Sequence, residues 1–228
     1  MSIHHTLPQR PYRRIATEEA FSPPEMLDIY RRILAKDDVD VGFKHLMGFY
    51  MSSPSERAQH IMRCLVDLDE LRLQHMDAAG VDVQVIGLTS PGVQIMDKET
   101  AVAFAPEAND VLAAATRRHP DRLVGMGQTA MRTIKEGISD LERIKAMGFK
   151  GVMMPGNPGE KDYDDPAFDP FWEAAVALEL PLSFHILTTS GDNSLAKPRG
   201  PKRDGSRDDA GGFDKPKRPP MGQSRTAN

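Results

Sequence analysis

Two adjacent carboxylates, Glu18 and Glu19, end a short apolar segment that reads RIATEEAF at residues 14–21. Side chains alternate between the two faces of a strand, so Ala16, Glu18 and Ala20 would share one face. The small alanines would leave room for an ion or a ligand above Glu18. Glu19 would point the other way, toward helices and a basic group. The simpler alternative is that both carboxylates only close the strand.

His185 is a second candidate, near the end of the apolar run PLSFHIL at residues 181–187. If both segments are parallel strands of one barrel, Glu18 and His185 would face each other across one barrel end. Carboxylate and imidazole groups are both ligands of Zn²⁺ or Mn²⁺. The pair therefore predicts a divalent metal site, although a lone histidine in an apolar strand is more commonly a core residue.

Composition places the chain among ordinary globular proteins. Its 228 residues are 39% hydrophobic and 27% charged, and the formal net charge of −4 does not indicate a nucleic-acid or membrane partner. Cys64 is the single cysteine, so no internal disulfide can form and a reducing cytoplasm is expected. We find no signal-peptide pattern at the N-terminus and no run of 18 apolar residues.

The chain alternates strand-like and helix-like segments. Ser53 or Ser55 could cap one long helix that Gly80 ends, and Gly148 could end a later helix. Strand-like runs begin near residues 14, 81, 123, 151 and 181, and helical patterns cover 23–34, 53–80, 101–122, 133–150 and 166–180. Strands separated by helices predict a parallel sheet, either doubly wound or closed as a (β/α) barrel.

Two features favour the barrel. No G-x-G-x-x-G motif follows any strand, which weakens the case for a dinucleotide-binding sheet. Each strand also runs into a polar or Gly/Pro-rich loop, which suits the active-site face of a barrel. We predict an α/β fold that forms a partial TIM-like (β/α) barrel of about five strands, over residues 13–190 and after a flexible N-terminus at 1–12.

The pattern changes after Ser190. Residues 191–228 hold nine Lys/Arg and five Asp/Glu, and only three large apolar side chains. Such a segment buries too little apolar surface to offset its ordering entropy. The sequence therefore predicts a disordered tail over residues 191–228.

Six segments in order resemble the amidohydrolase-related (amidohydrolase 2) family: IATEEAF, GFYMSSPSERA, MDAAGVDVQVIGLTSPGVQ, PDRLVGMG, GFKGVMMPG and PLSFHI. Within it they are most similar to metal-dependent, non-oxidative aromatic acid decarboxylases of the 5-carboxyvanillate type. The resemblance runs from about residue 12 to about residue 190. It implies the metal-dependent-hydrolase type of barrel, a divalent metal (Zn or Mn), a small aromatic carboxylate as substrate, and a homo-oligomer in intact relatives.

The resemblance also assigns roles residue by residue. Glu18 and His185 match metal ligands on the first and fifth strands, while Ala20 stands where a histidine is common. Arg57 matches an arginine associated with the substrate carboxylate. The loop LTSPGVQ, with Ser90, Pro91 and Gly92, matches a loop that lines the pocket. Other histidines are interpreted as surface residues: His4, His5, His45, His60, His75 and His119.

Two family features have no counterpart here, a histidine after strand six and an aspartate after strand eight. Residues 191–228 contain no histidine, as a frameshift or truncation would produce. We expect a carboxy-lyase of a hydroxylated aromatic acid that is inactive as this chain alone. The alternatives are a metal-dependent hydrolase with the same ligands, or a non-catalytic fragment that acts through a partner protein.

Overall fold

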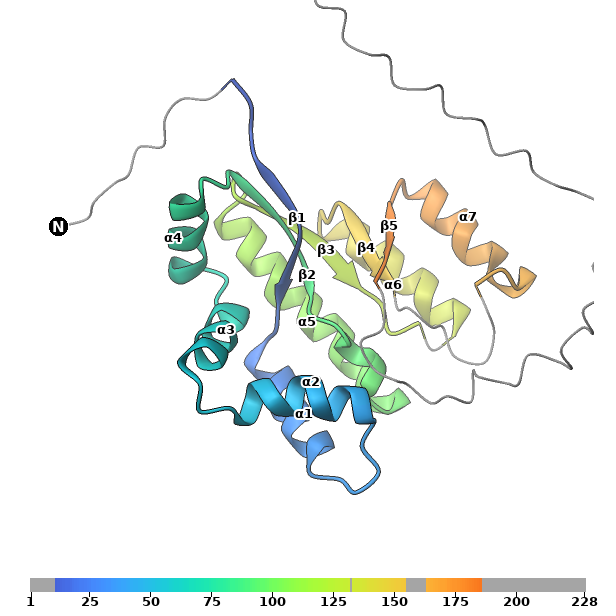
Figure 1. Ribbon diagram of the computed structural model, residues 1–228. Coiled ribbons are helices and arrows are strands. Elements are labelled where there is room, and N and C mark those ends of the chain that lie inside the picture. The colour runs from blue at the N-terminus through green and yellow to red at the C-terminus, as the bar shows by residue number, and fades with distance from the viewer. Residues whose placement is uncertain (1–10, 132, 155–162, 186–228) are drawn as a thin grey trace, which may run out of the picture. The chain divides into compact units, whose positions relative to one another are not determined.

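A parallel five-stranded sheet organises the computed structural model, which describes residues 11–131, 133–154 and 163–185 (Figure 1). Each strand pairs with the next one in sequence, whereas a doubly wound sheet reverses its strand order at a switch point. The described residues therefore form a sector of a (β/α) barrel, which confirms the predicted fold class. The strands are β1 (Ile15–Phe21), β2 (Val83–Leu88), β3 (Leu123–Gln128), β4 (Gly151–Met154) and β5 (Leu182–Phe184).

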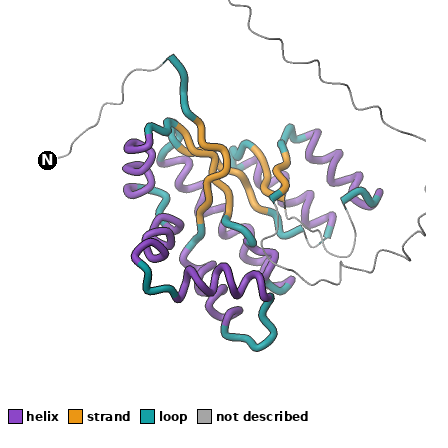
Figure 2. Tube along the Cα trace, in the orientation of Figure 1, coloured by secondary structure: helices purple, strands orange, loops and turns teal. Residues whose placement is uncertain are grey.

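Helices occupy every connection between the strands, and Figure 2 shows them flanking the sheet. Four lie between β1 and β2, namely α1 (Pro24–Leu34), α2 (Val41–Ser52), α3 (Glu56–Val66) and α4 (Glu70–Ala79). The later connections hold η1 (Gly92–Ile95) with α5 (Lys98–Arg118), then α6 (Ile134–Ala146), then η2 (Pro166–Phe168) with α7 (Asp169–Ala177). Helices α1 and α2 lie beyond the carboxyl end of β1 (Figure 1). Over the described residues, no helix has the length and apolarity needed to cross a bilayer.

Side-chain caps define where several helices begin. Asp40 accepts a hydrogen bond from the Phe43 amide at 2.7 Å, and Asp97 accepts one from the Thr100 amide at 2.9 Å. Each bond satisfies an amide that has no partner inside its helix. Gly80 ends α4 with φ of 68°, in the left-handed conformation that glycine adopts without strain. This confirms the predicted end of the helix at Gly80.

The core lies between the sheet and its helices, and α6 approaches β3 very closely. A Cβ added to Gly127 would lie 2.5 Å from Ile144 Cγ1, and one added to Gly125 would lie 2.4 Å from the Phe149 ring. These two positions on β3 therefore have no room for a side chain. The absence of side chains lets Ile144 and Phe149 pack directly against the strand.

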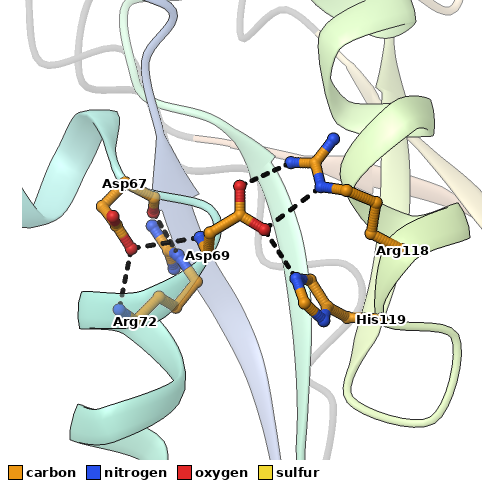
Figure 3. Close-up of polar contacts among 5 residues, drawn as sticks. All are labelled: Asp67, Asp69, Arg72, Arg118 and His119. Atoms are coloured by element: carbon orange, nitrogen blue, oxygen red, sulfur yellow. Dashed lines mark hydrogen bonds and ion pairs between the residues drawn. The ribbon is translucent and has the colours of Figure 1, made fainter.

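The single helix predicted over residues 53–80 is wrong, because α3 ends at Val66 and α4 begins at Glu70. Asp67 is extended, and its Oδ1 accepts hydrogen bonds from the Asp69 and Arg72 amides at 3.1 and 2.8 Å. The Asp69 carboxylate bonds Arg118 and His119 at the end of α5, with shortest distances of 2.7 and 2.6 Å (Figure 3). The break thus lets the chain turn and contact another helix.

Helix α2 was not indicated by the sequence pattern. Its two glycines and dense apolar residues hide the helical period, but the Asp40 cap starts it. The buried Phe43 ring packs edge-on against Tyr30 of α1, with 4.9 Å between centroids. The predicted disordered tail at 191–228 and most of the flexible segment at 1–12 lie outside the described residues.

Candidate active site at the carboxyl ends of the strands

A hollow that is open to solvent lies at the carboxyl ends of β2 to β5, and its volume of about 240 Å³ includes part of that solvent space. Polar groups and methionines share its lining, which combines an imidazole, amides and a hydroxyl with apolar surface. The lining includes Ser90, Pro91, Gly92, Gln128, Met153 and His185. A concave site with a few convergent polar groups is the usual form of a small-molecule site. The hollow brings together four of the residues to which the sequence analysis assigned site roles, Ser90, Pro91, Gly92 and His185.

The loop after β2 is held in place by α1. The Tyr30 hydroxyl donates a hydrogen bond to the Gly92 carbonyl at 2.9 Å. Burial raises the pKa of the Tyr30 phenol far above its usual range, so the group stays a neutral donor. Gly92 has φ of +60°, and the Ser90–Pro91 peptide is cis. Residues 62 apart in sequence thus position the loop that lines the hollow.

Gln128 is a lining residue that the sequence analysis missed. Its backbone is clamped by Asn109 of α5, whose side-chain amide donates to the Gln128 carbonyl at 2.8 Å. The Asn109 Oδ1 atom accepts from the Gln128 amide, also at 2.8 Å. These bonds fix the end of β3 and give the buried Asn109 a structural role. The available signal was a polar residue directly after the apolar run LVGMG.

Gln94 contributes an unsatisfied acceptor to the hollow. Among the described residues, none provides a hydrogen-bond partner for its buried Oε1 atom. A buried polar atom without a partner carries a desolvation cost of roughly 1–3 kcal/mol. Because this atom is almost fully buried, a ligand in the hollow would reach it only after the Gln94 side chain moved.

Glu18 lies in an irregular part of β1 and is exposed. Ala16 pairs with Gln84 and Glu19 with Ile86, so β1 has one residue more than β2 over this stretch. Such a bulge interrupts the alternation of side chains. Beyond it, Ala20 pairs with Gly87, where an added Cβ would face Met153 and Met126.

The prediction that Ala16 and Ala20 share one face of β1 is therefore wrong. Ala16 pairs with Gln84, which accepts a hydrogen bond from Arg72 on the helix side, at 3.0 Å. Ala20 instead pairs with Gly87, and a Cβ at Gly87 would point toward Met153 and Met126 on the other side of the sheet. A bulge depends on strand pairing, so the local alternation pattern could not reveal it.

Glu19 does meet a basic group, as the alternation pattern predicted. Burial lowers the pKa of Arg72, and the charge of Glu19 is the largest influence that opposes this shift. Arg72 is 8% exposed and donates hydrogen bonds to the carbonyls of Ala20 and Asp67, at 2.8 and 2.7 Å. Glu19 therefore balances the charge of an arginine that joins β1 to the α3–α4 junction.

The structure does not bring every predicted site residue to the hollow. Arg57 is exposed on the first turn of α3, and neither Arg57 nor Glu18 belongs to the described lining. His185 does belong to it, because it directly follows β5 and its amide donates a hydrogen bond to the Met154 carbonyl of β4 at 3.5 Å. The hollow as described offers one imidazole together with hydroxyl and amide groups.

Comparisons with known proteins agree with this architecture. The model of the Amidohydrolase family matches residues 61–219. The gamma-resorcylate decarboxylase of Rhizobium radiobacter is 29% identical over 180 residues, which cover 75% of this chain and 49% of that protein.

Solved structures give the same result. A 5-carboxyvanillate decarboxylase from Novosphingobium aromaticivorans is 41% identical with a TM-score of 0.72, over 77% of this chain and 51% of that one. That crystal structure holds manganese and 3-methoxy-4-hydroxy-5-nitrobenzoic acid. A 2,6-dihydroxybenzoate decarboxylase from Rhizobium is 28% identical with a TM-score of 0.60, over 76% of this chain and 49% of that one.

The chain spans about half the length of these relatives. The TM-score of 0.72 shows that its parallel five-stranded sheet and flanking helices share the fold of the matched part of the 5-carboxyvanillate decarboxylase. The matched family model covers more than half of its residues. The chain belongs to the Amidohydrolase family.

Proposed function

We propose that this chain carries part of the site of a metal-dependent, non-oxidative decarboxylase that acts on a hydroxylated aromatic acid. The observation that carries the proposal is the meeting of His185 with the loop Ser90–Pro91–Gly92 in one hollow at the strand ends. The similarity to aromatic acid decarboxylases supports the reaction class.

The donor chemistry fits a divalent ion such as manganese or zinc. The Glu18 carboxylate and the His185 imidazole would hold it, since both groups are ligands of these metals. When bound, the ion would supply a template and a Lewis acid for the substrate's carboxylate and neighbouring phenol oxygen. Catalytic zinc sites usually use three protein ligands. We therefore propose that further ligands come from outside the described residues.

Several side chains could bind and orient the substrate. After a movement of its side chain, the unpartnered Gln94 Oε1 could accept a hydrogen bond from a phenolic hydroxyl. Met153 and Leu88 line the hollow and offer apolar surface to an aromatic ring. We assign Arg57 as the partner of the substrate carboxylate, through paired N–H donors. Its support is the resemblance, since Arg57 lies outside the described lining.

In this reaction the ring carbon that bears the carboxylate gains a proton, and carbon dioxide leaves as aromaticity returns. We propose that the proton donor also lies outside the described residues. With only two metal ligands, this chain alone should bind the metal weakly and release carbon dioxide at a negligible rate.

Binding of 4-hydroxy-3-methoxy-5-nitrobenzoic acid tests the proposal, because nitrophenolate absorbance reports the environment of the ring. We expect a spectral shift that requires Mn²⁺, that His185→Gln abolishes and that His45→Gln leaves intact. His45 is an exposed histidine on α2, outside the lining. A shift of equal size in His185→Gln would contradict the site. In a version of the protein that also contains the further metal ligands and the proton donor, carbon dioxide release from 5-carboxyvanillate, compared with hydrolysis of an ester or amide analogue, separates the two reaction classes.

A further inference from the structure

Three metal-ligating side chains converge on the helices between β1 and β2, away from the hollow. His60 and Cys64 lie four residues apart on α3, so they share one helix face. His75 reaches them from α4. The three ligand atoms all lie within 4.8 Å of one another, the one such group among the described residues.

The two sulfur–nitrogen separations match those of a tetrahedral metal site. Cys64 Sγ lies 3.5 Å from His60 Nε2 and 3.7 Å from His75 Nδ1. Zn–S and Zn–N bonds of about 2.3 Å and 2.0–2.1 Å at a tetrahedral angle place sulfur and nitrogen about 3.6 Å apart. The two imidazole rings are tilted by 50°, with centroids 5.2 Å apart, so they are not stacked face to face and a nitrogen of each ring can bind the same ion.

The scaffold under the cluster is already ordered by other bonds. Arg72 of α4 donates to the Cys64 carbonyl at 3.2 Å, while it also binds the Asp67 carbonyl and the Gln84 side chain. The end of α3 is therefore anchored to α4 and β2, and the cluster spans a junction whose geometry does not depend on the metal.

We propose that His60, Cys64 and His75 form a second metal site that binds Zn²⁺ through Nε2, Sγ and Nδ1. Binding would release the thiol proton to solvent, because the thiolate is the ligand. The histidines are exposed, so water could complete the fourth position. The bound ion would fasten α3 to α4. The proposal does not depend on the decarboxylase site.

Ligand softness separates this site from the proposed site at the strand ends. A thiolate with two imidazoles selects Zn²⁺ and related soft or borderline ions, whereas Mn²⁺ prefers oxygen ligands. The alternative is that weak S–H···N hydrogen bonds and ring contacts alone hold the three side chains together. These two explanations differ in a measurable way, because only the first requires the cluster to bind metal.

Cobalt(II) substitution of the full chain provides the test. Cys64 is the only cysteine, so a thiolate-to-cobalt charge-transfer band can arise only there. We expect this band with tetrahedral d–d bands, and we expect one equivalent of Zn²⁺ to remove both while Mn²⁺ does not. A spectrum without thiolate absorption, or one that Mn²⁺ abolishes as well as Zn²⁺, would overturn the proposal.

Variants complete the design. Cys64→Ser should abolish the charge-transfer band. His60→Gln and His75→Gln should each weaken Zn²⁺ binding by at least about tenfold, because even the loss of a residue that only supports a metal ligand weakens binding by about that factor. His45→Gln is the matched control for an exposed histidine and should leave the affinity unchanged. Circular dichroism checks that each variant keeps its helix content. Unchanged Zn²⁺ affinity in folded Cys64→Ser, or equal losses in His45→Gln and His75→Gln, would refute the site.

Discussion

At the scale of single residues, Arg72 connects more of the fold than any motif suggested. It bonds three carbonyls and one side-chain amide, and these belong to β1, α3, the α3–α4 junction and β2. The sequence shows only an arginine on an amphipathic helix, because its partners lie up to 52 residues away. A charge at this position is tolerated because it is hydrogen-bonded and because Glu19 and Asp67 attract it.

Replacement of this arginine should destabilise the fold strongly. We expect Arg72→Met to lower the free energy of unfolding by about 3 kcal/mol, since several buried acceptors would lose their donor. Arg63→Met on the exposed face of α3 is the control and should change it by less than about 0.5 kcal/mol. Urea denaturation followed by circular dichroism measures both. Similar effects for the two variants would contradict the role of Arg72.

Asp69 should make stability depend on pH in the acid range. Hydrogen bonds from Arg118 and His119 lower the pKa of its carboxyl group below the usual value. The stabilisation is therefore present above the unfolded-state pKa of about 3.9 and is lost as the pH falls through the lower folded-state pKa. Both side chains of the Asp69–Arg118 ion pair are exposed, so its contribution to the free energy of unfolding should be at most about 1 kcal/mol.

The measurement compares wild type with Asp69→Asn in urea from about pH 6 to about pH 2.5, a range that spans the unfolded-state pKa. The difference in free energy of unfolding between wild type and Asp69→Asn should be constant at the higher pH values and should vanish at the lowest ones. Asp38→Asn, at an exposed position before α2, should show no such gap. A gap that grew as the pH fell would have the wrong sign for this account.

At the scale of elements, alanine substitutions at two glycines should change stability in opposite directions, because one glycine lies where α6 packs closely on β3 and the other lies in α2 with free space around it. Gly127→Ala should destabilise the protein by about 1–3 kcal/mol, because its Cβ would lie 2.5 Å from Ile144. Gly48→Ala within α2 should stabilise it by about 0.5–1 kcal/mol, since its Cβ meets nothing nearer than 3.7 Å and alanine favours helix. Thermal unfolding of both variants checks this, and destabilisation by Gly48→Ala would show that α2 packs differently.

The elements show which sequence signals suffice. Apolar runs and the spacing of helical segments predicted all five strands and their order, because these patterns are local. The break at residues 67–69 was missed, since a continuous helical pattern does not show that Asp67 caps one helix while Asp69 contacts another. The bulge in β1 was missed for a related reason, because it exists only relative to β2.

At the scale of the whole molecule, the outer strands of the described sheet bear on association. β1 and β5 are its edges, and Ile15 on β1 is 55% exposed. Exposed apolar edge strands favour pairing with another chain. We expect this chain to self-associate and Ile15→Lys to reduce the association. Val41→Lys, at an exposed position away from the sheet, should not. Sedimentation velocity checks this, and a monodisperse wild-type monomer would contradict it.

The candidate site was only partly predictable. The resemblance picked out His185 and the loop Ser90–Pro91–Gly92, and the structure brings them together. Gln128 and Gln94 were not picked out, because their place in the hollow depends on how distant segments fold together. The His60–Cys64–His75 cluster was missed for the same reason, although the spacing of His60 and Cys64 suits one helix face.

Manganese affinity of the full chain tests the central claim most directly, and electron paramagnetic resonance of free Mn²⁺ measures it. The account predicts that Glu18→Gln and His185→Gln each weaken binding by at least about tenfold. Glu19→Gln should leave the affinity nearly unchanged, because the charge of Glu19 acts on the buried Arg72 instead. Equal losses for Glu18→Gln and Glu19→Gln, or a loss in Glu19→Gln alone, would contradict the proposed metal site.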